Sequence, residues 1–425
     1  MSIYSAFYAS LSGLSSNANA LGVIGNNLAN LNTIGYKSSN VSFQDLFSSA
    51  LGGTSIQGNG DPIQIGLGAS MASVAQDFSQ GSPQATGTVT NMALQGEGFF
   101  TLQAQSGAAC YTRSGNFSID KNGFLVDPSG NKVMGWNAVA GVVNANGSPA
   151  PIFLNPGATS PPLPTSTIAN TTNLNAASAA GTTFTAPIAV YDSQGASHNV
   201  EITYTKTAVA GQWSTSLKTD DPTVTVTGTN GYGPSPNNLI QFDPSGNLTT
   251  PASGNNPVLT LTPWASGATS PAITVNIWSG NPAASSLTGY AQTSGTSSTT
   301  QNGYSAGSVS GMSVDQNGNI VGTFTNGQTM SLAQVAVSTF ANNNGLVMDG
   351  SNTWATTLAS GTANVGTANT GGRATVLGSN LESSNVDVAT EFTKLIINQN
   401  GYQANSRVIT TANTLLQTVI SLIQG

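Results

Sequence analysis

Residues 386–425 read VDVATEFTKLIINQNGYQANSRVITTANTLLQTVISLIQG. No proline interrupts this stretch, and its only interior glycine is Gly401. Apolar side chains recur in it at alternating steps of four and three residues, which is the heptad pattern of a helix that packs along a partner helix. One half of the seam is apolar throughout, comprising Val388, Leu395, Tyr402, Ile409, Leu416 and Ile423. The pattern predicts a C-terminal helix roughly 50 Å long.

The other half of the seam is mixed in character. Phe392 and Ile420 are apolar, whereas Gln399, Ser406 and Asn413 are polar and uncharged. Polar residues at such positions weaken a helix pair but restrict its register and its choice of partner. A helix of this length is unusual in a globular domain, so we expect it to serve in assembly.

The N-terminus carries a matching pattern. The same alternation of steps is occupied by Phe7, Leu11, Leu14, Ala18, Leu21, Gly25 and Leu28. This helix is predicted to end near Asn32, because asparagine and the nearby Gly35 are typical of helix ends and turns. Two interpretations stay open at this point. The terminal helices pack on one globular core, or they pair with each other and with the helices of neighbouring copies.

The composition limits the classes of partner. The chain has 425 residues, which favours two to three domains. Only 6% of its residues are charged, against roughly 25% in ordinary soluble proteins. Few charges suit a protein that packs against copies of itself, although they also suit an extracellular protein. The net charge of −7 offers no basic patch for phosphates, so we expect no nucleic-acid partner.

The uncharged start of the chain does not resemble a secretory signal. No charged residue precedes Lys37, so a basic leading region is missing, and the apolar residues are interspersed with Ser, Asn and Gly. No window reaches the roughly 18 consecutive apolar residues of a membrane span. We therefore expect no cleaved signal peptide and no membrane insertion. The single cysteine, Cys110, lies in a strand-like run and is predicted to be a small buried hydrophobe.

The region between the helices has the period of two that is typical of strands. Asn116–Ile119 and Phe124–Val126 are predicted to form a hairpin around Asn122-Gly123. Residues 118–126 recur at 313–321, where Ser, Asp, Asn, Gly and Val are identical in the same order. We interpret both copies as structural turns. A calcium loop of the EF-hand type would need a Glu as its twelfth residue, and the twelfth residue counted from Asp315 is Asn326.

These patterns predict a mainly β fold with α-helical termini. We expect two nested antiparallel β-domains in a line, plus a paired heptad-helix domain formed by the two termini. The predicted domains are a helical assembly domain of residues 1–32 and 384–425, connector segments of 33–73 and 361–383, an inner β-domain of 74–148 and 286–360, and an inserted outer β-domain of 149–285.

No catalytic constellation is visible in the sequence. The only histidine, His198, lies in the turn-like stretch Gln194–His198 and is interpreted as a solvated loop residue. Neither a Gly-x-Ser-x-Gly elbow nor a phosphate-binding loop ending in Gly-Lys-Ser/Thr occurs. We therefore expect no enzyme activity, no cofactor and no metal.

Five stretches resemble the bacterial flagellar rod and hook protein family. They are NNLANLNTIGYK at 26–37, LQGEGFF at 94–100, YTRSGNF at 111–117, LESSNVD at 381–387 and YQANSRVI at 402–409. They occur in the family's order and bracket nearly the whole chain. The length of the middle insertion, together with VYDSQG at 190–195 and GTFTNGQT at 322–329, is most similar to the hook members of the family.

The resemblance implies a structural subunit that assembles into a helical tube. Such a tube acts as a flexible universal joint that transmits torque from rod to filament, outside the cell surface in the hook of the flagellum. The implied partners are other copies of the chain, the distal rod, the hook cap, the hook–filament junction proteins and the flagellar type III export apparatus. Terminal helices would line the tube, while the connectors would let rigid β-domains slide.

The family also carries an export-gate motif after its first helix, which Phe43 and Phe47 match with three residues between them. An alternative role for these two phenylalanines is to hold the connector to a neighbouring surface. Two other functions remain open for the whole chain. One is a distal rod or hook–filament junction protein, and the other, from a different class, is a secreted β-rich adhesin or carbohydrate-binding protein.

Overall fold

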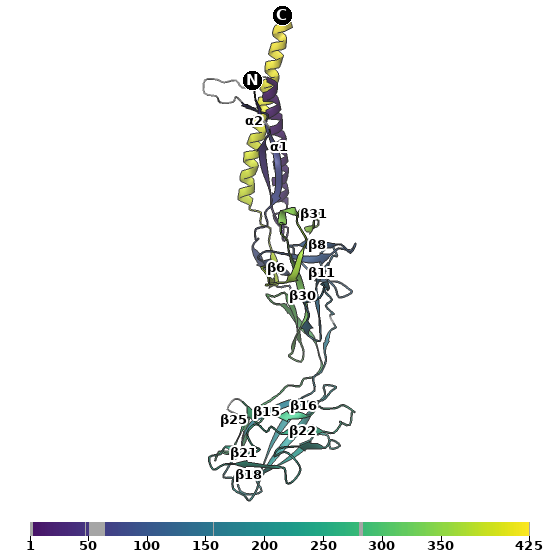
Figure 1. The fold of residues 1–425 in the computed structure, drawn as a ribbon, viewed down its shortest axis with the longest axis vertical. Helices are drawn as coiled ribbons and strands as arrows, with labels where there is room; N and C mark the ends of the chain where they lie inside the picture. Colours follow the sequence, from purple (N-terminus) through teal and green to yellow (C-terminus); the bar gives the residue numbers. More distant parts are fainter. Residues whose placement is uncertain (1–2, 47, 51–63, 156, 280–283, 425) are drawn as a thin grey trace. The chain divides into compact units, whose positions relative to one another are not determined.

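The computed structural model describes residues 3–46, 48–50, 64–155, 157–279 and 284–424. A helix stands at each end of a mainly β chain, α1 (Ile3–Ala29) and α2 (Val388–Gln424), as Figure 1 shows. The predicted fold class, mainly β with helical termini, is confirmed. Asp387 caps the start of α2, where its Oδ1 accepts the N–H of Thr390 at 2.7 Å. No helix in the described residues is long and apolar enough to cross a membrane.

The chain divides into two compact units. The helix-bearing unit comprises Met1–Pro156, Met312–Gly322 and Met330–Gly425, and the inserted unit comprises Gly157–Gly311 and Thr323–Thr329. The insertion is therefore longer than the predicted 149–285. Its last long strand, β27 (Gly295–Gln301), pairs along β15 (Thr167–Asn173), which carries residues 286–301 away from the predicted inner β-domain.

The inserted unit contains two main sheets. The first is β16 (Thr183–Tyr191), β17 (Ser197–Lys206), β18 (Gln212–Thr219), β20 (Leu239–Phe242) and β21 (Leu248–Thr250). The second is β15, β27, β19 (Val226–Gly228), β22 (Val258–Leu261), β23 (Ile273–Val275) and β26 (Leu287–Thr288). The inserted unit also has three short strands outside these two sheets, namely β14 (Thr159–Ser160), β24 (Trp278–Ser279) and β25 (Ala284–Ser285).

Every second side chain along β16 and β17 is buried in the core of the inserted unit. Ile188, Val200 and Ile202 point inward toward Trp213, which is 1% exposed. The predicted purely antiparallel pairing is wrong in one place. β15 pairs in parallel with β23 at Thr167–Ile168 and with β26 at Thr172–Asn173.

The β part of the helix-bearing unit is one large sheet with small strand pairs beside it. The sheet includes β7 (Phe99–Gln103), β8 (Ala109–Thr112), β9 (Ser118–Ile119), β10 (Leu125–Val126), β11 (Lys132–Val139), β12 (Val142–Val143), β13 (Ala150–Pro151), β30 (Thr329–Thr339), β31 (Val347–Gly350), β32 (Thr353–Ala355) and β33 (Asn364–Thr367). Strands β28 (Gly307–Val314) and β29 (Asn319–Phe324) contribute residues to both units. A short 3-10 helix, η1 (Asn343–Gly345), follows β30.

The segments predicted to be connectors are strands rather than free loops. Within 361–383, β33 pairs with β30, β34 (Thr375–Gly378) pairs with β6 (Met92–Gln95), and β35 (Asn380–Glu382) pairs with β5 (Pro83–Ala85). Within 33–73, β1 (Ser39–Asp45) pairs with β4 (Ala69–Gln76), and β2 (Ser48–Ala50) with β3 (Gln64–Gly66). The strands of 361–383 are thus hydrogen-bonded to other strands of the helix-bearing unit, whereas those of the first segment pair with each other. Sliding of these segments in an assembly stays a prediction.

Five turns share one construction. In each, an aspartate Oδ1 accepts the N–H groups of the residues two and four positions further on, at 2.7–2.9 Å. The aspartates are Asp120, Asp127, Asp192, Asp243 and Asp315. The glycine three positions after each aspartate has positive φ, which explains that residue type. These contacts support the structural interpretation of the sequence repeat and extend it to three turns that the sequence comparison missed.

Candidate assembly site

The two terminal helices pack along each other in antiparallel orientation. Nδ2 of Asn27 in α1 donates to Oε2 of Glu391 in α2 at 3.1 Å. Nearer the middle of α1, Gly13 lies against the side chain of Asn405. The partner number thus falls along α2 as the residue number rises along α1, and Figure 1 shows the helices side by side.

Small and polar residues make this intrachain contact. A Cβ on Gly13 would lie 2.7 Å from Nδ2 of Asn405, so a larger residue there would displace the Asn405 amide. Ala20 and Ile24 are buried on α1, and Ala412 is buried on α2. Because little apolar surface is covered, the pairing relies on close backbone approach and hydrogen bonds as much as on hydrophobic burial.

The predicted seam does not coincide with this intrachain contact. Its exposed members are Leu11, Val388, Phe392, Tyr402 and Ile420. Its half-buried members are Phe7, Leu14, Leu21, Leu28, Leu395, Ile409 and Leu416. The side chain of Ile423 lies outside the described residues. Since small residues at neighbouring positions bring the helices together, much of the predicted seam faces away from the partner helix.

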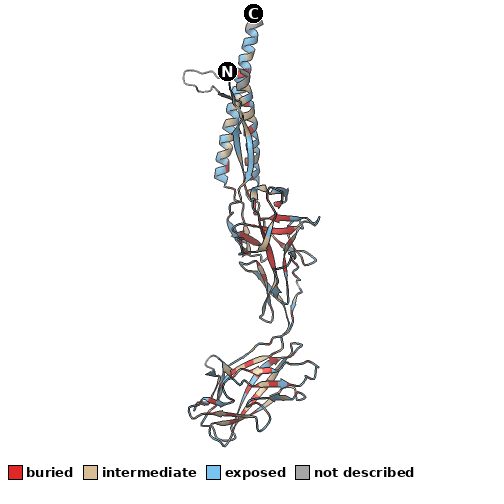
Figure 2. Ribbon diagram, viewed as in Figure 1, coloured by how far each residue is buried: buried red, intermediate tan, exposed pale blue. Residues whose placement is uncertain are grey.

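Further large apolar side chains join the exposed members of the seam. They are Tyr8 on α1, and Ile396, Ile397, Val408, Leu415 and Val419 on α2. Together with Leu11, Val388, Phe392, Tyr402 and Ile420 they form what we call the helix surface. Figure 2 shows α2 as largely pale blue, the colour of exposed residues. Strict heptad counting missed Ile396 and Ile397, although the doubled Ile-Ile in the sequence was a visible signal of a broader apolar face.

The β1–β4 hairpin lies against α1 and exposes a second apolar face. Oγ of Ser16 donates to the carbonyl of Ala69 at 3.2 Å, which holds β4 to the helix. Phe43 in β1 is 46% exposed, and Met71 and Val74 in β4 are exposed to a similar degree. Phe47, the other residue of the candidate export-gate motif, lies outside the described residues.

Below the helices, three charged side chains meet in the interior. Nζ of Lys37 lies 2.6 Å from Oε1 of Glu382, and both side chains are 0% exposed. Nη1 of Arg113 lies 3.5 Å from the other carboxylate oxygen of Glu382. Glu382 belongs to β35, Arg113 follows β8, and Lys37 follows the end of α1, so the cluster joins three distant parts of the sequence.

Burial sets the protonation properties around this cluster. Burial lowers the pKa of the Lys37 ammonium, and the adjacent Glu382 carboxylate acts in the opposite direction. Burial likewise lowers the pKa of Arg113, again opposed by Glu382. Nearer the helices, burial and then the Glu391 carboxylate raise the pKa of the Tyr36 hydroxyl. Sequence reasoning did not identify this cluster, although charges are so rare in the chain that each one inside a motif deserved notice.

The sole histidine is more enclosed than the sequence indicated. His198 lies in β17, directly after its first residue Ser197, instead of in a solvated loop, and its ring stacks on Trp264 with centroids 3.5 Å apart. Its Nε2 lies 3.1 Å from Oδ2 of Asp192, and its Nδ1 lies 3.8 Å from Oδ1 of Asp220. No nucleophilic side chain contacts the ring in any described contact, so a packing role explains this arrangement.

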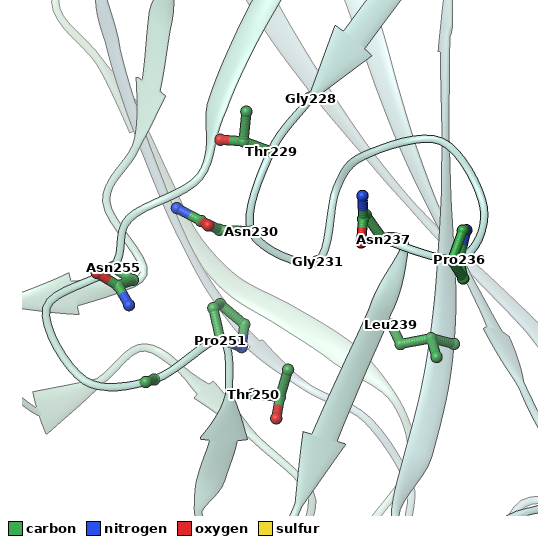
Figure 3. Close-up of a pocket in the computed structure, with 11 residues that line it drawn as sticks. Gly228, Thr229, Asn230, Gly231, Pro236, Asn237, Leu239, Thr250, Pro251 and Asn255 are labelled. Carbon is green, nitrogen blue, oxygen red and sulfur yellow. The ribbon is translucent and has the colours of Figure 1, made fainter.

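Other candidate sites lack reactive groups. Cys110 is buried, and burial, followed by Asp127 and Asp349, raises the pKa of its thiol to about 11. Among the described residues, no group of three or more His, Cys, Asp and Glu is placed to hold a metal ion. A hollow of about 630 Å³ lies in the inserted unit. Figure 3 shows Asn230, Asn237 and Asn255 among the residues that line it. None of its lining residues is ionisable.

The chain matches four protein-family models. The model described as flagella basal body rod protein matches residues 7–37. The flagellar hook protein FlgE/F/G D1 domain matches 93–171, and the flagellar basal body protein FlaE D2 domain matches 158–304. The flagellar basal body rod FlgEFG protein C-terminal model matches 378–422.

Similar full-length proteins come from several bacteria. The chain is 33% identical to the flagellar hook protein FlgE of Treponema pallidum (strain Nichols), covering 98% of both chains. It is 31% identical to the flagellar hook protein FlgE of Escherichia coli (strain K12), covering 98% of this chain and 100% of that protein. The crystal structure of Helicobacter pylori flagellar hook protein FlgE2 is 13% identical with a TM-score of 0.48, covering 71% of this chain and 100% of that one.

Proposed function

The chain belongs to the flagellar hook protein family and is a structural subunit of the bacterial flagellar hook, and we propose that its helix surface supplies the main contacts between subunits. Members of this family polymerise with themselves and associate with other flagellar components. The family's hook serves as a universal joint. The matched families are structural, and none is catalytic.

The observation that carries this proposal is the amount of apolar surface that the helix pair leaves uncovered. Ile397 is 64% exposed and Ile420 is 54% exposed, and both lie on a helix of 37 residues. Monomeric proteins seldom expose contiguous apolar patches of more than a few hundred Å². Few charged side chains surround this surface: on α2 they are Glu391, Lys394 and Arg407. Apolar faces of neighbouring helices would cover it and remove it from water.

The proposal includes partners beyond other copies of the chain. We assign to it contacts with the distal rod, the hook cap and the hook–filament junction proteins, and delivery to the outside of the cell by the flagellar type III apparatus. Phe43 is 46% exposed, so its ring is accessible both for the export role proposed here and for the alternative, packing against a neighbouring surface. Phe43→Ser should therefore reduce secretion without changing the thermal unfolding of the purified protein. Unchanged secretion would remove the export role of Phe43.

Electron microscopy of the concentrated, purified chain tests the main proposal. We expect tubes, curved as in a flexible hook. Straight tubes would favour the alternative of a distal rod protein. If the protein forms no polymer at any concentration and instead retains glycans in a binding screen, the alternative of an adhesin or carbohydrate-binding protein replaces the hook assignment of this surface.

A further inference from the structure

We propose that Lys37, Arg113 and Glu382 form an electrostatic latch that closes both ends of the chain onto the inner β-sheets, with Glu382 as its shared counter-ion. The latch lies entirely within the helix-bearing unit. The latch extends the proposed function. Only its effect in the assembled hook rests on that function, because its contacts lie within one subunit.

Glu382 is held from several directions. Its Oε1 accepts the Lys37 ammonium and also the N–H of Gly81 at 2.8 Å, while its backbone carbonyl accepts the N–H of Gly35 at 2.7 Å. Gly35 has φ of +68°, and a Cβ there would lie 2.7 Å from the backbone of Arg113. The segment after α1, the segment after β8 and strand β35 thus touch each other at one carboxylate.

The two cations have other polar contacts, but among the described residues Glu382 is the one buried anion paired with them. Nζ of Lys37 also donates to the carbonyl of Ser79 at 2.6 Å. Nη2 of Arg113 donates to the carbonyl of Gly96 at 2.8 Å, and its guanidinium lies over the ring of Phe99. Nε of Arg113 has no partner among the described residues. Carbonyl oxygens solvate a cation only in part, so the carboxylate is the group that makes burial of two cations tolerable.

The remaining nearby charges are weaker counter-ions. Asp77 acts on Lys37, and Glu97 acts on Arg113, each after Glu382 in strength. Glu97 is exposed, and neither Asp77 nor Glu97 forms an ion pair with the cluster within the described residues. Without Glu382, the positive charges of Lys37 and Arg113 would face each other in a site closed to water. Their repulsion and desolvation would strongly oppose packing of the segment after α1 against the β-sheets.

This arrangement makes closing of the latch depend on the C-terminal segment. Lys37 and Arg113 precede Glu382 by hundreds of residues. The segment after α1 therefore cannot pack stably in the cluster until β35, which carries Glu382, has paired with β5. Once closed, the latch fixes the segments that join the helices to the β-sheets. In the hook it would make the helix-bearing unit a single stiff part, so that bending arises elsewhere.

Hydrogen exchange of the full-length monomer tests the latch. The reporting amides are those of residues 35–39 and 380–386, and the amides of β7 and β8 serve as the reference. Glu382→Gln changes the side-chain volume little but leaves two unpaired cations. It should speed exchange of the reporting amides about 100-fold. Lys37→Met leaves Arg113 paired with Glu382, so the site keeps no unbalanced charge. It should speed exchange of the reporting amides less than about 10-fold.

A double variant guards against general misfolding. Adding Lys37→Met to Glu382→Gln removes one of the two unpaired cations, so it should slow exchange again by about 10-fold relative to Glu382→Gln alone. The matched controls are Glu201→Gln and Lys218→Met, whose residues face each other across β17 and β18 in the inserted unit. They should leave the reporting amides unchanged.

The latch is overturned if Lys37→Met speeds exchange as much as Glu382→Gln does, or if the double variant exchanges faster than Glu382→Gln. Either result would show that packing, and not charge balance, holds the site. These measurements use dilute monomer and are independent of the tube test. Failure of the latch with tubes intact therefore leaves the proposed function standing, and loss of tubes by wild-type protein leaves the latch standing.

Discussion

Asn27 donates its side-chain amide to Glu391 at 3.1 Å, although the two residues are 364 positions apart in the sequence. Asn27 is 0% exposed and Glu391 is 3% exposed. The same asparagine accepts the N–H of Ser39 at 2.9 Å and donates to its carbonyl at 2.8 Å. One side chain therefore joins α1, α2 and the start of the β1–β4 hairpin.

Asn27→Ala should loosen the helix pair. The substitution removes the side-chain hydrogen bonds of Asn27 to Ser39, Glu391 and Tyr36 and leaves the buried Glu391 carboxylate with fewer donors, at a cost of about 1–3 kcal/mol. Hydrogen exchange of α1 and the first turns of α2 should accelerate accordingly. The control is Asn19→Ala, an exposed asparagine on the same helix. Equal effects of the two substitutions would contradict a special role for Asn27.

Glycine-to-alanine substitutions in α1 should differ by position. Nothing lies within 4 Å of a Cβ built on Gly22, so Gly22→Ala should stabilise the helix by up to about 1 kcal/mol through its higher helix propensity. Gly13→Ala should gain less or lose, because the Asn405 amide must move away. Helix content by circular dichroism and exchange of α1 amides measure the difference. The close contact is disproved if both variants gain equally.

The turn at Asp243 should weaken in acid. Hydrogen bonds from the backbone and side chain of Asn247 lower the pKa of Asp243, so the folded state releases its proton more readily than the unfolded chain. The resulting stability is present above the unfolded pKa of about 4 and is lost as pH falls through the lower folded value. Asp243→Ala should therefore lower the thermal midpoint at pH 7 more than at pH 2.5.

Asp243→Asn is the matched control for that experiment. Its amide oxygen can still accept the N–H groups of Ser245 and Asn247, so the loss at pH 7 should be smaller than with alanine. A difference between wild type and Asp243→Ala that stays constant from pH 7 to pH 2.5 would show that the carboxylate charge contributes nothing to the turn.

Removal of the last part of α2 should separate assembly from folding. Deleting residues 411–425 takes away Leu415, Val419 and Ile420 from the helix surface, so we expect complete loss of tubes by electron microscopy. Both β-sheet regions have their own cores and should unfold at an unchanged temperature. A full-length variant with Thr410→Ala, an exposed residue of α2, should still polymerise. Tubes formed by the deleted chain would exclude the assembly role of this segment.

Periodic and local signals in the sequence predicted much of the fold. The heptad pattern located α2, the alternation at Phe184, Ile188 and Val190 located β16, and Asn122-Gly123 located a hairpin turn. These features depend on neighbours within a few residues, which is why a single sequence reveals them. The segment 361–383 was misread because its glycines and alanines have weak propensities, and only pairing with distant strands makes it β.

The sequence by itself determined which residues are apolar, how often they recur, and hence that long helices flank a β-rich middle. It could not determine which face of each helix meets the other, because a heptad pattern is the same for a partner within the chain and a partner in another copy. The tertiary structure decided that question through Gly13 against Asn405 and Asn27 against Glu391. It also brought Lys37, Arg113 and Glu382 together. No local pattern encodes that meeting, since buried charges are stable only where the whole fold supplies the opposite charge.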